Sequence, residues 1–201
     1  MSVIQKPFTF VLIIFMVAAP ALARVMSMPF KDAIAHSELI VSGKVIQVIE
    51  CYQDFDRGNI KIAELEVTQI LKGNSQVKRI HFWASPTWVC DISDARDGET
   101  LVLLLVQSKE RFSADKQFSK NSIEEHLRTY MNGRPLYDIV QSGGGRMIIN
   151  STQVRLNSYL DYPEEIYATA RRPTEFSGLM VPLHLITTYI KQQVASPGKR
   201  D

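Results

Sequence analysis

The sequence predicts a mainly β fold, and three features of the pattern support this assignment. Apolar and polar residues alternate through residues 60–71, which is typical of a strand with one dry and one wet face. Residues 38–50 form a longer strand pattern interrupted by Gly43, which predicts a bend or bulge of the kind that curves a sheet into a barrel. Residues 100–106 are apolar throughout, which predicts the most buried strand of the sheet.

The N-terminal segment has the pattern of a secretory signal peptide. Lys6 precedes an apolar run over residues 8–19, and Ala21-Leu22-Ala23 supplies small residues at the positions that signal peptidase requires. The run is shorter than a membrane span needs. We therefore expect cleavage before Arg24 and export to the periplasm or the extracellular space.

Composition limits the partners that the exported chain can attract. The full sequence has 23 Lys and Arg against 21 Asp and Glu, a net charge of +2, and loss of Lys6 with the leader would leave +1. A nearly neutral chain has no general attraction for nucleic acid or for an anionic membrane. Lys72, Lys78 and Arg79 form a local basic cluster, which we interpret as a solvated turn. No later segment is apolar enough to span a bilayer.

The remaining elements are expected on both sides of a long insertion. A short helix is predicted at 30–37, and Ser142–Gly145 is predicted to be a hairpin turn because no phosphate-loop signature follows its glycines. A capping box at Ser122–Glu125 predicts a short helix within the insertion at 108–134, for which a lid role stays open. Further strands are expected at 77–84, 136–141, 146–150 and 153–156.

The C-terminal part predicts one amphipathic helix at about 182–194. Pro182 is placed at its start, and an apolar stripe recurs at helical spacing through Leu183, Ile186, Ile190 and Val194. The stripe needs an apolar surface to cover, and the barrel is the expected one. The expected organisation is a signal peptide at 1–23, a barrel domain at 24–156 and a C-terminal extension at 157–201.

Cys51 and Cys90 are predicted to form a disulfide, because an even pair of cysteines in an oxidising compartment is normally paired. Such a bridge would stabilise the fold by roughly 4 kcal/mol in the chain-entropy model. The four histidines are far apart in sequence and form no metal-binding motif, so neither a metal nor another cofactor is expected.

The order of these patterns resembles the netrin and tissue-inhibitor-of-metalloproteinase superfamily, whose barrel is of the OB type. The resemblance rests on residues 37–45, on Glu66–Gly73, on Cys90 and on Gly98–Leu105, and it covers roughly 33–106. It implies a closed five-stranded barrel. These inhibitors bind a protease's zinc through an N-terminal cysteine, whereas Arg24 is the expected first residue here, so inhibition of that kind is not implied.

Motifs for catalysis are missing from the sequence: there is no Gly-x-Ser-x-Gly elbow, no His-Glu-x-x-His and no dinucleotide fingerprint. A non-enzymatic module that binds a protein partner is the favoured class, since OB barrels bind through the face of their second and third strands and through the flanking loops. A loop-based protease inhibitor and an enzyme with an unrecognised site stay open. Asn150 begins a glycosylation sequon. The expected partner contacts are aromatic residues at the disulfide end and on the wet face of the third strand, although they could instead plug the barrel end: Tyr52, Phe55, His81, Trp83 and Trp88.

Overall fold

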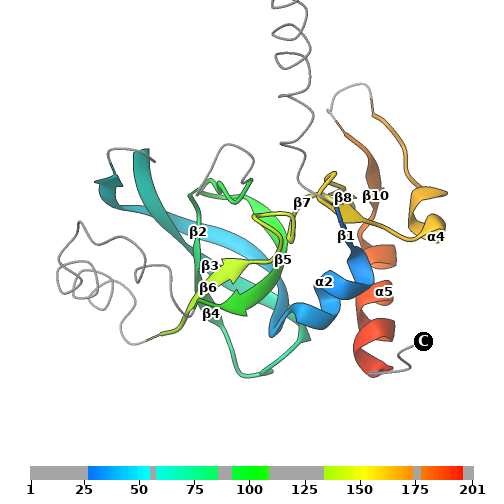
Figure 1. The fold of residues 1–201 in the computed structure, drawn as a ribbon, viewed down its shortest axis with the longest axis horizontal. Helices are drawn as coiled ribbons and strands as arrows, with labels where there is room; N and C mark the ends of the chain where they lie inside the picture. The colour runs from blue at the N-terminus through cyan, green and yellow to red at the C-terminus, as the bar shows by residue number, and fades with distance from the viewer. Residues whose placement is uncertain (1–26, 55–57, 86–91, 109–133, 174–177, 197–201) are drawn as a thin grey trace, which may run out of the picture.

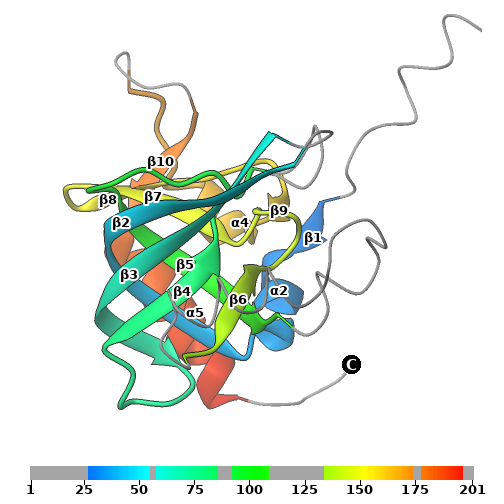
Figure 2. The same ribbon diagram turned by 90° about the vertical axis from the view of Figure 1, so that its left-hand side faces the viewer.

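Five strands close into a β-barrel at the centre of the molecule (Figures 1 and 2). The structure, a computed structural model, describes residues 27–54, 58–85, 92–108, 134–173 and 178–196, with the backbone alone described at 51–54 and 58–60. Around the barrel the strands run in the order β5-β2-β3-β4-β6, and β6 closes it by pairing with β5. All neighbours are antiparallel except β4 and β6, which are parallel. The strands are β2 (Leu39–Asp54), β3 (Gly58–Lys72), β4 (Arg79–Trp83), β5 (Thr100–Gln107) and β6 (Leu136–Ile139). This confirms the predicted fold class.

The barrel interior is filled by every second residue of its strands, as strand geometry requires. Gly43 lies within β2 at a shift of the β2–β3 register, which confirms the predicted bulge. A Cβ atom at Gly43 would collide with the carbonyl oxygen of Glu66 and would lie 2.9 Å from Cδ2 of Leu65. A glycine is therefore needed where β2 and β3 approach closely. Inward-facing residues include Val41, Val45, Ala63, Leu65, Ile80, Phe82, Leu101 and Leu103.

Three further strands extend the sheet beyond β5: β7 (Arg146–Asn150), β8 (Gln153–Arg155) and β10 (Met180–Pro182). The predicted hairpin at Ser142–Gly145 was wrong, because β6 and β7 both run antiparallel to β5, along the same edge of it. The chain leaves that edge at Val140, whose N–H donates to the Leu104 carbonyl at 3.0 Å. It returns at Gly145, whose carbonyl accepts from the Leu104 N–H at 2.9 Å. Together β6 and β7 therefore occupy the place of one strand along β5, and the turn between Val140 and Gly145 interrupts it.

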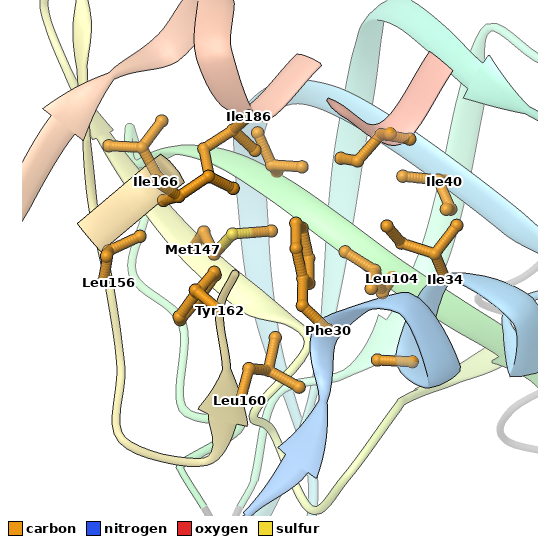
Figure 3. Close-up of a cluster of buried hydrophobic side chains, with 14 of the residues drawn as sticks. Phe30, Ile34, Ile40, Leu104, Met147, Leu156, Leu160, Tyr162, Ile166 and Ile186 are labelled. Carbon is orange, nitrogen blue, oxygen red and sulfur yellow. The ribbon is translucent and has the colours of Figure 1, made fainter. Parts of the chain in front are cut away.

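Two helices cover the outer face of the extended sheet: α2 (Phe30–His36) and α5 (Leu183–Ala195). The helices predicted at 30–37 and at about 182–194 are confirmed. Ile186 and Ile190 of α5 are fully buried, and Leu183 and Val194 pack at the margin of the same core. Figure 3 shows this second core, in which Phe30 and Ile34 of α2 point toward the side chains of the sheet. Lys72, predicted to lie in a solvated turn, instead donates its ammonium group to the carbonyls of Ile34 and Ala35 at the end of α2, at 2.8 and 3.1 Å.

Strand β5 is buried on both faces, as its continuous apolar sequence predicts. Leu101, Leu103 and Leu105 point into the barrel, whereas Val102 and Leu104 point outward beneath the helices. All five side chains are inaccessible to solvent. Each of the two cores therefore takes one face of the same strand.

The first part of the C-terminal extension contains short elements that complete the outer core. These are β9 (Leu160–Asp161), which pairs in parallel with β1 (Met28–Pro29), and α4 (Glu164–Tyr167). Leu160, Tyr162 and Ile166 pack among the residues of α2 and α5. The predicted helix within the 108–134 insertion lies outside the described residues. Within the described part of the chain, no helix combines the length and apolar character needed to cross a membrane.

Candidate functional site

The predicted contact residues divide into those that the structure describes and those that it does not. His81 and Trp83 lie on β4. Tyr52 lies on β2, where its backbone pairs with Ile60, but its side chain is outside the described part, as are Phe55 and Trp88. The signal peptide and Cys90 fall outside the described residues and only the backbone of Cys51 is described, so the structure does not test the predicted Cys51–Cys90 bridge. The disulfide, and the contact role of the aromatic residues near it, thus stay predictions.

The expectation that His81 and Trp83 lie on a wet strand face was wrong. Both side chains do point outward, opposite Glu64 and Ile62 of β3, but only 3% of His81 and 2% of Trp83 is exposed. Chain segments distant in sequence lie against this face. Ser108, which follows β5, accepts a hydrogen bond from the Trp83 indole at 3.2 Å, and Arg134, just before β6, reaches Glu64. The side chains of His81 and Trp83 are therefore buried parts of the fold on this face.

Glu64 organises the charged groups on the outer face of β3 and β4. Its Oε1 atom accepts from Arg79 at 3.4 Å and from Arg134 at 3.2 Å, so that one carboxylate joins β3, β4 and the segment before β6. The Glu64 side chain is 13% exposed, whereas the two arginines are 48% and 44% exposed. Each guanidinium group has five N–H donors, so a single contact leaves most of its donors available.

Burial favours the neutral form of the His81 imidazole, which lies opposite Glu64 in the register of β3 and β4. Burial is the main cause that lowers its pKa; the carboxylate of Glu64 opposes the shift, and Arg134 adds to it. Its Nδ1 atom is buried and has no hydrogen-bond partner among the described residues. A neutral, buried imidazole of this kind packs against the strand pair and offers no accessible charge.

A groove of about 470 Å³ opens beside the ion pair, between the beginnings of β4 and β6. Its lining is more apolar than polar, with Val77, Pro135 and Tyr137 contributing to it. Its three cationic side chains are Lys78, Arg79 and Arg134. Lys78 and Arg79 belong to the basic cluster that the sequence led us to interpret as a solvated turn, and Arg134 is brought to them by the parallel pairing of β4 and β6. The lone Arg134-Pro135 pair gives no signal of this in the sequence.

The groove exists because β4 and β6 pair only from His81 and Leu136 onward. Lys78 accepts a hydrogen bond from Val67 of β3, so strand alternation turns the N–H and C=O groups of Arg79 toward the opposite edge, where β6 would continue. Pro135 has no N–H group to donate to that edge. The two strands therefore separate at this point and leave the edge of β4 facing the groove.

Comparisons with known proteins add no assignment to this site: neither a protein-family model nor a curated protein matches the chain. Among the described residues, no group of three or more His, Cys, Asp and Glu side chains is placed to hold a metal ion. On this face of the described part, the accessible charged groups are Arg79 and Arg134, which Glu64 holds beside the groove.

Proposed function

We propose that this chain is an exported, non-enzymatic protein-interaction module that binds its partner through the part of the β3–β4 face at Arg79 and Arg134, since His81 and Trp83 on the same face are buried. The observation that carries the proposal is the set of two partly exposed arginines, held by Glu64 beside an open groove. Interfaces are enriched in arginine, and a guanidinium that is already positioned loses less freedom on binding. Export rests on the signal-peptide pattern of the sequence.

The position of this face within the barrel supports the same assignment. OB-type barrels bind ligands on the face of their second and third strands, which here are β3 and β4. The outer face of β5 is already covered by α2 and α5 and cannot serve. The resemblance to the netrin and tissue-inhibitor superfamily is consistent with a barrel that acts by binding.

Site-specific photo-cross-linking in the native envelope tests the proposal. A photoreactive residue at the exposed position Glu66, on the outer face of β3, should give a defined cross-linked product with another protein. The same residue at Lys191, on the exposed side of α5, is the matched control and should give none. A product from Lys191 alone would place the interaction on the wrong face. Absence of a product from both positions would contradict the module itself.

A further inference from the structure

We propose that the groove between β4 and β6 binds an extended, acidic segment of the partner protein, which adds to the edge of β4 at Arg79, where the described residues provide no strand partner. This inference rests on the proposed function, and it specifies which chemistry the partner must present. The arrangement of charge, the available strand edge and the apolar floor each contribute to it.

The positive charge that lines the groove favours an acidic ligand. Lys78, Arg79 and Arg134 line the groove, and among the described residues Lys78 forms no ion pair. Arg79 and Arg134 share one oxygen of Glu64, so the three cations retain an excess of positive charge even after that carboxylate is counted. Carboxylates are the natural ligands of such a set, because guanidinium groups bind them through paired hydrogen bonds.

The edge of β4 that faces the groove favours an extended ligand. The backbone N–H and C=O groups of Arg79 face the groove, and Pro135 on the opposite side has no N–H group. An extended peptide can supply both a donor and an acceptor to this edge, as in other cases of strand addition.

The cations that line the groove lie on both faces of the sheet at this edge. Lys78 has the same parity along the strand as Ile80, which points into the barrel, whereas Arg79 and Arg134 meet on the outer face. Successive side chains of an added strand also alternate between these sides. The preferred segment therefore carries adjacent acidic residues, with an apolar residue for the floor at Val77 and Tyr137.

Fluorescence anisotropy with a labelled peptide of Glu and Val residues tests this inference directly, with the same peptide carrying Gln in place of Glu as its control. The acidic peptide should bind, and its affinity should fall as salt rises. Lys78→Gln and Arg134→Gln should each weaken binding about tenfold, the expected loss of one charge-assisted contact. Lys191→Gln, a distant lysine on α5, should have no effect.

Glu64→Gln supplies the sharpest variant, because it removes the internal competitor for both arginines. It should tighten binding of the acidic peptide by roughly two- to fivefold, while the folding of all variants is checked by circular dichroism. Equal binding of the Gln peptide, or no binding of the acidic one, would overturn the inference. If Glu66 still cross-links to a partner in that case, the proposed function stands and only the acidic segment is refuted.

Discussion

The barrel has two outer faces that differ in the side chains they carry and in what covers them. On β5 the outward residues Val102 and Leu104 are apolar and lie beneath α2 and α5. On β3 the outward residues Glu64 and Glu66 are acidic and face arginines and solvent. The comparison teaches that apolar outward residues are covered by helices of the same chain, whereas the charged outward residues of β3 form ion pairs or stay exposed to solvent.

The largest expected effect is loss of the apolar contact beneath the helices. Leu104→Ala should lower the free energy of unfolding by about 2–5 kcal/mol, since the side chain is fully buried and leaves a cavity. Urea denaturation measures this change. Leu103→Ala, on the opposite face of β5, is the matched variant and should cost a similar amount. A Leu104 variant as stable as the wild type would refute the view that the helices depend on this strand.

A second prediction tests the close approach of β2 and β3, which lies between the two faces. Gly43→Ala should destabilise the fold by about 1–3 kcal/mol, because the new Cβ would meet the Glu66 carbonyl oxygen and Leu65. Thermal unfolding followed by circular dichroism measures it. Gly98→Ala, where a Cβ would meet nothing within 4 Å but φ is +83°, separates steric collision from backbone strain.

The contact of Lys72 with α2 should matter less. Lys72→Met keeps most of the aliphatic length but removes the donor to the carbonyls of Ile34 and Ala35. We expect a loss of about 1–2 kcal/mol in urea denaturation, the usual cost of a hydrogen bond from a charged group. Lys44→Met, at an exposed position on β2, should be close to neutral. Equal effects of the two substitutions would show that Lys72 acts only as a surface charge.

His81 should make the stability of the fold depend on pH. Its pKa is lowered in the folded state from the ordinary value of 6.5, so the unfolded state binds a proton more readily. The contribution of this group to stability is complete above pH 6.5 and is lost as the pH falls toward the folded-state pKa. The groups facing the imidazole, Glu64 and Arg134, influence the shift in opposite directions. Unfolding free energies measured across this range should fall less steeply for His81→Gln than for the wild type.

The smallest effect on stability is expected at Glu64, which accepts hydrogen bonds from both arginines. Glu64→Gln should change stability by less than about 1 kcal/mol, because both arginines are about half exposed and solvent screens their attraction to the carboxylate. A loss as large as that of Leu104→Ala would mean that the charged face supports the fold in the same way as the apolar one.

Elements with a strong local pattern could be predicted from the sequence. The burial of β5 follows from its continuous apolar run, and the helix at 182–194 from the spacing of its apolar stripe. The alternation in β3 similarly predicts which residues enter the barrel, because side-chain direction follows strand parity.

The candidate site could be predicted only in part, because its groups come from segments far apart in the chain. Arg134 meets Glu64 across a separation of 70 residues, which no local pattern reveals. The indole of Trp83 likewise donates a hydrogen bond to Ser108, which lies beyond the end of β5. The expected hairpin at Ser142–Gly145 was wrong because glycine-rich turns report a change of direction but not the strand that each flank joins.

The shared position of β5 has a consequence for the exchange of amide hydrogens with solvent. Its backbone pairs with β2 along one edge and with β7 and β6 along the other, while each face belongs to a different core. Releasing either core exposes this strand and so weakens the other, which couples the barrel and the helical layer into one cooperative unit. The central amides of β5 should consequently exchange only when the whole domain opens, and they report its global free energy of unfolding.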